Sequence, residues 1–467
     1  MPFTHPYIPN SAPAVKAEML RRIGLESVEQ LHRDVPAELR LGRPLDLPPR
    51  CESEQELYRH VSGILKKNTD CSEVVSFLGS GCYQHYVPAI CDEINARAEF
   101  RSAYAGEPYD DHGRFQALFE YQSLMAELVD MDVVNVPAID GAQAAATSIR
   151  MAQRITGRNR ALVCADIHPD KLGVIRNYCT PSMDIDVFAV DRATGRIDLN
   201  GLRPAVDGKT AAVYLDYPSF LGVLPDGGEL PEIANIAHTA GAECVVGLDP
   251  SLLGVLESPA NLGADILCGD IQPLGMHMNY GGGLAGFIAT RGEERYVREY
   301  PSRLFGITNT IVEGEYGFGD VAYGRTSFVD RENSKEYVGT QAALWGVTAG
   351  VYLALLGPDG MKALGERIIT SSRYLAKRLG EVRGVAVKYR NFAKELVVDF
   401  NATGETVAVI NDGLYQRGFF GGADLSAIVP ELGQCALYCC TEVISKRDID
   451  RLADALTEVL AGITGKS

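Results

Sequence analysis

One short segment of the chain has the residue types of an anion-binding site. The sequence Asp140-Gly141-Ala142-Gln143 follows an apolar run of strand type and precedes a pattern typical of a helix. The first N–H groups of a helix have no partner within it, and the helix dipole attracts phosphate or carboxylate groups to this end. A simpler interpretation stays open, in which Asp140 is an ordinary N-cap and Gly141 forms a turn. The segment therefore predicts a helix N-terminus that could hold an anion.

A second feature is an aspartate at the end of a predicted strand. The run Val245–Leu248 is followed directly by Asp249. Ligands of open α/β sheets bind at the carboxyl ends of strands, and an aspartate there could pair with the pyridinium nitrogen of pyridoxal 5′-phosphate (PLP). Aspartate is also common at strand ends that bind nothing. Together with the anion site, Asp249 favours an α/β fold of the PLP-dependent transferases, the aspartate aminotransferase-like fold type I.

The lysine that PLP chemistry on this fold would need is absent from its expected place. Enzymes of this kind hold the cofactor as a Schiff base on a lysine, which here should follow the predicted strand Ile266–Cys268. The chain has 12 lysines, and none lies between Lys209 and Lys335. We therefore expect no catalytic residue and no covalently bound cofactor in this chain. The two aspartates and the glycine named above are then vestiges of a cofactor site.

Other catalytic motifs are absent from the sequence. There is no G-x-G-x-x-G, no P-loop, no G-x-S-x-G and no H-E-x-x-H. The run Asp110-Asp111-His112 could chelate a cation, but adjacent polar residues in a loop more often face solvent. We predict no metal site. A further alternative is a self-sufficient enzyme that works without PLP. Its only candidate catalytic side chains would be these three.

Short apolar runs alternate with helical patterns over most of the chain. Helices such as Gln143–Ile155 and Glu229–Thr239 separate runs that predict strands. Continuous apolar strands between helices are typical of a parallel sheet that is covered on both faces. The predicted strands are Val133–Val136, Ala161–Cys164, Ile185–Val190, Ala212–Leu215, Cys244–Leu248, Ile266–Cys268 and Leu284–Ala289.

The pattern divides the chain into three parts. We expect an N-terminal helical arm over residues 1–75, a large α/β domain over 76–335, and an interdomain helix with a small C-terminal α+β domain over 336–467. Helical spacing in the arm and short strands in the last part support this division. The segments concerned are Ala14–Ile23 and Ser53–Leu65 in the arm, and Glu395–Phe400, 405–417, Ala436–Cys440 and 446–461 in the last part.

Acidic residues outnumber basic ones, 61 to 44, which gives a formal net charge of −17. Nucleic acid and anionic membrane surfaces require a clustered basic face, so we expect neither as a partner. The uncharged stretch Gly339–Pro358 is long enough to span a bilayer, but its polar and glycine residues favour a buried helix at a subunit interface. Eleven scattered cysteines without a C-x-x-C pair, and an N-terminus unlike a signal peptide, favour a cytoplasmic protein.

Several stretches spread nearly end to end match one family in order. They are Tyr7–Pro9, Pro44–Pro48, Phe77–Pro88, Gln116–Gln122, Met131–Asn135, Asp140–Ala142, Ala264–Gly269, Gln272–Gly275, Tyr352–Pro358, Gly421–Leu425 and Pro430–Gly433. With these motifs the chain resembles the P-protein family of the glycine cleavage system. Within that family it is similar to the α subunit, or subunit 1, of the two-subunit glycine dehydrogenase (decarboxylating).

The resemblance implies that the work is divided between two subunits. The P-protein binds PLP, decarboxylates glycine and passes the aminomethyl group to the lipoyl arm of the H-protein. In the two-subunit form the β subunit carries the Schiff-base lysine, and the α subunit has the same fold without it. The implied partners are a PLP-bearing β subunit, in a heterotetramer of two αβ pairs, and the lipoylated H-protein. The isolated chain is expected to be inactive.

One segment departs from the family pattern. After Ala103-Tyr104 the family usually reads Thr-Pro-Tyr-Gln-Pro-Glu-Ile-Ser-Gln-Gly, whereas Ala105–Arg114 here reads Ala-Gly-Glu-Pro-Tyr-Asp-Asp-His-Gly-Arg. Two alternatives therefore stay open. One is a paralogous subunit that pairs with a divergent PLP-bearing partner on another amino acid, and the other is a non-catalytic scaffold of the same fold.

The family geometry also nominates residues for the pocket or the subunit interface. These are Tyr83, His85, Tyr104, Asp110, His112 and Gln272. A purely structural role is open for each, since buried polar side chains commonly just satisfy hydrogen bonds. Without a pyridinium nitrogen beside it, Asp249 would need another donor or a raised pKa.

Overall fold

The structure is a computed structural model. It describes residues 7–100, 112–301, 303–326, 329–330, 332, 335–336 and 342–464. The chain divides into two compact units, Met1–Thr69 and Asp70–Ser467. The second unit contains the sheets, the predicted pocket and both chemical features from which the sequence reasoning started.

The first unit contains two of the predicted helices, α1 (Pro13–Arg22) and α2 (Glu54–Leu65). Helix α2 begins after Ser53, whose hydroxyl accepts a hydrogen bond from the backbone N–H of Glu56 at 3.1 Å, as an N-cap does. Among the residues of this unit whose burial is described, Leu20 alone is buried. This unit therefore has almost no hydrophobic core of its own.

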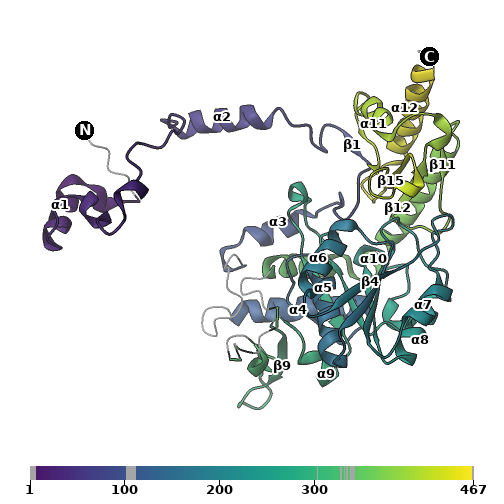
Figure 1. Ribbon diagram of the computed structural model, residues 1–467, viewed down its shortest axis with the longest axis horizontal. Helices are drawn as coiled ribbons and strands as arrows, with labels where there is room; N and C mark the ends of the chain where they lie inside the picture. Colours follow the sequence, from purple (N-terminus) through teal and green to yellow (C-terminus); the bar gives the residue numbers. More distant parts are fainter. Residues whose placement is uncertain are drawn as a thin grey trace. The chain divides into compact units, whose positions relative to one another are not determined.

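The second unit is organised around a seven-stranded sheet in the order β2-β8-β7-β6-β5-β3-β4. Its edge strand β4 is labelled in Figure 1. All seven apolar runs identified in the sequence are strands. Their bounds are β2 (Val133–Val134), β3 (Arg160–Cys164), β4 (Asp184–Phe188), β5 (Thr210–Tyr217), β6 (Glu243–Leu248), β7 (Ile266–Asp270) and β8 (Gly286–Thr290).

The expectation of a purely parallel sheet was wrong at one edge. Strands β3 to β7 pair in parallel, but β8 runs antiparallel to both β7 and β2. A parallel neighbour needs a crossover connection, usually a helix. Between β7 and β8 the only helix is the short turn Asn279–Gly281, so the chain reverses direction at this point.

Helices cover both faces of this sheet, which explains the unbroken apolar character of its strands. Neighbouring residues of one strand belong to two different cores: Val245 and Ile266 pack with α5 (Gly141–Thr156), whereas Val246 and Leu267 pack with α8 (Glu229–Thr239). The remaining helices of this part are α3 (Ala89–Ala96), α4 (His112–Val129), α6 (Pro169–Cys179), α7 (Leu199–Ala205) and α9 (Glu294–Val297). A hairpin of β9 (Phe305–Asn309) and β10 (Tyr316–Asp320) follows α9.

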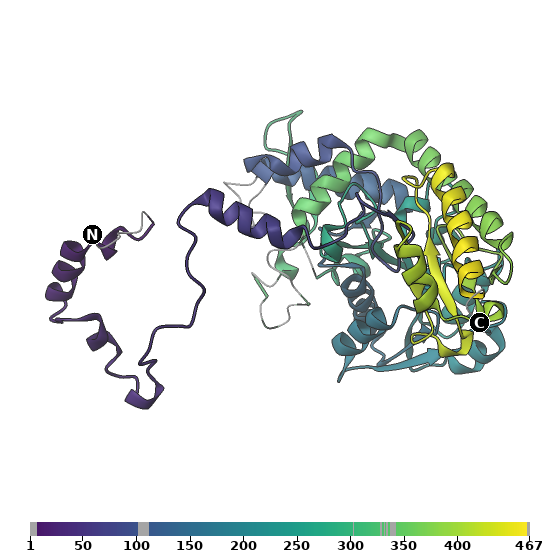
Figure 2. The same cartoon turned by 90° about the horizontal axis from the view of Figure 1, so that it is seen from above.

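The long helix α10 (Ala343–Gly380) leads into a smaller lobe and bends where Gly357 takes a φ of +58° ahead of Pro358. The lobe holds a four-stranded antiparallel sheet in the order β11-β12-β15-β14, with helix α12 beside it (Figure 2). The strands and helices predicted for this region are confirmed. The elements are β11 (Ala386–Val387), β12 (Glu395–Asp399), α11 (Val407–Tyr415), β13 (Phe419–Phe420), β14 (Ala423–Asp424), β15 (Cys435–Cys439) and α12 (Lys446–Thr464), with β1 (Val75–Ser76) paired in parallel with β13.

Of the uncharged stretch that was long enough for a bilayer, residues 343–358 form the first part of α10. Several of its residues are buried in the protein core, among them Val347 and Tyr352. Within the described part of the chain, no helix combines the length and the apolar character that crossing a membrane requires.

Candidate functional site

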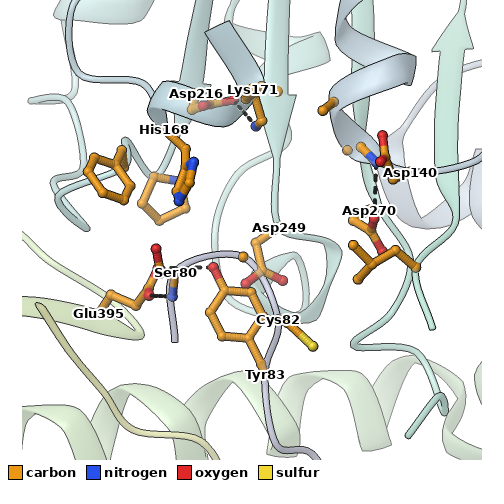
Figure 3. A pocket seen from close by; sticks show the side chains of 18 of the residues that line it. Ser80, Cys82, Tyr83, Asp140, His168, Lys171, Asp216, Asp249, Asp270 and Glu395 are labelled. Carbon is orange, nitrogen blue, oxygen red and sulfur yellow. Dashed lines mark hydrogen bonds and ion pairs between the residues drawn. The ribbon is translucent and has the colours of Figure 1, made fainter. Parts of the chain in front are cut away.

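A cavity of about 470 Å³ lies at the carboxyl ends of β5, β6 and β7, where ligands of open α/β sheets bind. The N-termini of α5 and α6 line it as well, together with the segment Ser80–Tyr83 and the start of β12 from the smaller lobe. Figure 3 shows the side chains of Asp140, Asp249 and Asp270 at this cavity. The fold therefore brings the two predicted chemical features, Asp140-Gly141 and Asp249, to one place.

Asp249 follows β6 directly and is paired with a lysine from the smaller lobe. The Lys394 ammonium contacts its Oδ2 atom, and the Ser251 hydroxyl donates to its Oδ1 atom at 2.7 Å. The Lys394 side chain is only 2% exposed. Burial alone would raise the pKa of Asp249, but the adjacent ammonium outweighs it and holds the pKa below its usual value. Asp249 is thus an ionised carboxylate whose cation is supplied by the protein itself.

His85 continues this chain of polar groups on the other side of the lysine. Its Nε2 atom lies 3.1 Å from Lys394 Nζ, and its Nδ1 atom lies 2.7 Å from Glu442 Oε2. An ammonium can only donate, so Nε2 is the acceptor and Nδ1 carries the hydrogen that Glu442 accepts. Burial and the neighbouring ammonium both lower the pKa of His85, which keeps the imidazole neutral.

Tyr83 closes the pocket on the side of the smaller lobe. Its ring lies 3.9 Å from the Lys394 ammonium, within cation–π distance. Its hydroxyl donates to Glu395 Oε2 at 2.9 Å, and the backbone N–H of Ser80 donates to Glu395 Oε1 at 2.6 Å. The fully buried Gln272 bonds both backbone groups of Tyr83, accepting from its N–H at 3.1 Å and donating to its carbonyl at 2.8 Å.

The predicted anion site at the start of α5 is filled by a carboxylate. Asp140 is the N-cap, accepting from the Gln143 N–H at 2.7 Å, and the Gly141 N–H donates to Asp270 Oδ2 at 3.0 Å. A side chain at Gly141 would place its Cβ 3.0 Å from the Asp270 nitrogen, so glycine permits this close approach. Burial raises the pKa of Asp270 to about 7.

The remaining cation of the pocket is also paired. Lys171, on α6, bonds Asp216 Oδ1 at 2.8 Å, and the Tyr214 hydroxyl donates to the same atom at 2.7 Å. No group of three or more histidine, cysteine, aspartate or glutamate side chains within the described ranges is arranged to hold a metal ion. The pocket is thus a set of internal ion pairs around a cavity.

We tested whether this pocket fits PLP. The cofactor needs a lysine for the Schiff base, an anionic partner for its ring nitrogen and free N–H groups for its phosphate. No lysine follows β7, since none lies between Lys209 and Lys335. Asp249 already holds Lys394, and the Gly141 N–H already holds a carboxylate. The residues present therefore do not fit the cofactor.

Of the predicted site residues, Asp249, Asp140 and Tyr83 line the cavity, and His85 bonds Lys394, which lines it as well. Gly141 and Gln272 contribute through the contacts given above. Tyr104 and Asp110 lie outside the described residues. His112 is the first residue of α4, and its side chain is not among those described.

Sequence reasoning missed several members of the site, namely Lys171, Asp216, Asp270, Lys394, Glu395 and Glu442. One signal was available. Lys394-Glu395 is a charged pair at the start of an apolar run, Leu396-Val397-Val398, in a chain with only 12 lysines. Charged residues are almost never fully buried without a partner. A charged pair at the start of a buried strand therefore predicts oppositely charged partners elsewhere in the chain.

Comparison with known families gives a match over nearly the whole sequence. The profile of the family described as "Glycine cleavage system P-protein" matches residues 5–456. Relatives named "Probable glycine dehydrogenase (decarboxylating) subunit 1" include one from Thermococcus onnurineus, 38% identical over 97% of this chain and 99% of its own length. One from Pyrococcus furiosus is 39% identical over 97% and 99%. One from Aeropyrum pernix is 36% identical over 98% and 100%.

Solved structures agree with the sequence matches. A crystal structure of glycine decarboxylase (P-protein) of the glycine cleavage system, in inhibitor-bound form, superposes with a TM-score of 0.84 at 33% identity, covering 98% of this chain and 100% of that one. A sphingosine-1-phosphate lyase from Burkholderia pseudomallei has a TM-score of 0.66 at 15% identity, over 91% and 94%. The predicted fold, fold type I of the PLP-dependent transferases, is confirmed.

Proposed function

The chain belongs to the glycine cleavage system P-protein family, and we propose that it is the α subunit, or subunit 1, of a two-subunit glycine dehydrogenase (decarboxylating). One observation supports the lysine-free role above all others. The pocket of this fold has no lysine after β7, and its strand-end Asp249 is paired with Lys394 instead of a cofactor. A chain with this pocket contributes to glycine decarboxylation as half of an enzyme.

The proposal assigns the cofactor to a partner. PLP would be held by a β subunit that carries the Schiff-base lysine, where it accepts the electrons released as glycine loses CO2. Relatives that are called subunit 1 support the existence of such a partner. In this proposal the two subunits form an αβ pair that doubles into a heterotetramer, and the aminomethyl group passes to the lipoylated H-protein.

We place this assembly in the cytoplasm. All eleven cysteines are free thiols, and most are buried, Cys244 and Cys268 within strands of the central sheet. Free thiols used as small apolar side chains are typical of a reducing compartment.

A second candidate function rests on the segment Ala105–Arg114, which departs from the family pattern and adds two aspartates and a histidine. In this version the chain pairs with a divergent PLP-bearing partner that acts on another amino acid. Co-expression of the chain with its β-like partner separates this function from glycine decarboxylation. The exchange of labelled CO2 is then measured with glycine and with a panel of other amino acids.

The test compares the chain alone with the chain co-expressed with its β-like partner. Alone, the chain should show no aldimine absorbance and no glycine-dependent CO2 exchange. With the partner, both should appear, and exchange should rise when lipoylated H-protein is added. The matched control is the partner purified alone. An aldimine that borohydride fixes to a lysine of this chain would refute the lysine-free role, and exchange by the partner alone at the full rate would indicate a non-catalytic scaffold.

A further inference from the structure

The pocket contains two internal charges whose positions and signs resemble those of the missing cofactor. PLP has a cationic ring nitrogen at one end and an anionic phosphate at the other. Here an ammonium, that of Lys394, lies on the aspartate that follows β6, and a carboxylate, that of Asp270, lies at the N-terminus of α5. We infer that Lys394 and Asp270 are built-in substitutes for the two charged ends of PLP, and that they close this pocket to the cofactor while keeping its shape.

The cationic half of the inference, that Lys394 replaces the ring nitrogen of PLP, rests on the surroundings of this lysine. Aspartate at this strand end is the position that serves the ring nitrogen in PLP enzymes, and it is buried enough to need a positive charge beside it. The ammonium meets that need from the smaller lobe. It also lies 3.9 Å from the Tyr83 ring and 3.1 Å from a His85 nitrogen. Every contact of this ammonium is thus to a group that stabilises a cation or accepts its hydrogen.

The anionic half of the inference, that Asp270 replaces the phosphate of PLP, rests on three backbone N–H groups that donate to this carboxylate. The Gly141 N–H donates to Oδ2 at 3.0 Å, and the N–H groups of Gln272 and Ala285 donate to Oδ1 at 2.8 and 3.3 Å. One of these donors, the Gly141 N–H, belongs to a helix N-terminus, where a phosphate would bind. The other two belong to the segment between β7 and β8. A phosphate that bonded the Gly141 N–H would have to displace the Asp270 carboxylate from it.

The substitution also adds polar contacts between the two lobes. Lys394 and Glu442 belong to the smaller lobe, Asp249 directly follows β6 of the large sheet, and His85 lies between β1 and α3. These four groups form one continuous chain of hydrogen bonds and ion pairs from Glu442 through His85 and Lys394 to Asp249. A ligand-free pocket in which these charges lacked partners would be unstable.

The experiment measures binding of pyridoxamine 5′-phosphate to the full chain by isothermal titration calorimetry. This probe has the ring nitrogen and the phosphate but no aldehyde, so it cannot react with surface lysines. The wild type should show no binding. The double variant Lys394→Ala/Asp270→Ala, which frees Asp249 and the Gly141 N–H, should bind the probe at least about tenfold more tightly than the weakest binding the calorimeter detects, since a charge-assisted contact is restored at each end.

The control adds Asp249→Asn to the double variant, which removes the partner of the ring nitrogen and should cancel most of the gain. Binding of the probe by the wild type would overturn the inference, and so would a gain that survives Asp249→Asn. Binding of this probe does not depend on glycine decarboxylation. A negative binding result would therefore leave the proposed function standing, and a negative exchange assay would leave this inference standing.

A second measurement covers the case in which the double variant does not fold. The single variant Lys394→Ala leaves a space the size of an alkylammonium beside Asp249. Ethylammonium should raise its melting temperature, but not that of the wild type or of Lys394→Ala/Asp249→Asn. Equal effects of ethylammonium on all three proteins would overturn the cationic half of the inference.

Discussion

Removing the charge of Lys394 should destabilise the protein far more than removing an exposed lysine of the same lobe. Lys394→Met keeps most of the side-chain volume and leaves the Asp249 carboxylate without its cation. Breaking one partner out of a buried ion pair costs about 3–5 kcal/mol. The Lys394 side chain is 2% exposed and that of Asp249 is 14% exposed, so solvent does little to screen the charge that remains.

This free energy converts into a measurable shift of the melting temperature. Unfolding entropy near the transition is about 2.1 cal/mol/K per residue, or about 0.8 kcal/mol/K for the roughly 400 residues of the second unit. Lys394→Met should therefore lower the melting temperature of this unit by about 4–6 °C. Differential scanning calorimetry of the purified full chain measures this directly.

Two further variants separate charge from packing. Lys394→Met/Asp249→Asn removes both charges together and should recover most of the loss, because replacing a whole buried pair is often neutral. Lys446→Met is the matched control: it breaks a lysine–aspartate pair of 2.7 Å whose lysine side chain is 71% exposed, and should leave the melting temperature close to that of the wild type. If Lys394→Met changed it no more than Lys446→Met does, the reasoning about the buried pair would be refuted.

Two other predictions concern the same network. Burial and the Lys394 ammonium lower the pKa of His85, so the unfolded chain binds a proton there more readily than the folded chain. The stability that depends on a neutral His85 should therefore be present above about pH 6.5 and be lost as the pH falls below that value. Urea titrations at several pH values should show that the unfolding free energy of His85→Gln depends less on acid pH than that of the wild type. An identical dependence on pH in the two proteins would contradict a neutral, buried His85. Gly222 has a φ of +76°, and an added Cβ would clash with the backbone carbonyl of Glu395, so Gly222→Ala should lower the unfolding free energy by at least about 2 kcal/mol. Its control, Gly173→Ala in open space within α6, should stabilise by about 0.5–1 kcal/mol, and equal effects of the two would refute the clash.

Local pattern was enough for most of the fold. Most of the apolar runs from Val133 to Ala289 became strands that are buried on two faces, and such a strand must be apolar along its whole length. The edge strand β4 is the exception, since only Phe188 of its five residues is buried. The N-cap role of Asp140 followed from residue type and position. The antiparallel direction of β8 could not be predicted from residue types, because it depends on how the chain returns to the sheet and not on the composition of the strand.

What the sequence by itself determined is that no lysine lies between Lys209 and Lys335, since a residue that does not occur in an interval cannot be supplied there by folding. What replaces the cofactor was decided only by tertiary structure. His85 and Lys394 are 309 residues apart in the chain, and they meet at Asp249 because β12 of the smaller lobe lies over the end of β6. Partners in a buried ion pair are selected by distance in space and by burial, and neither quantity can be read from a linear sequence.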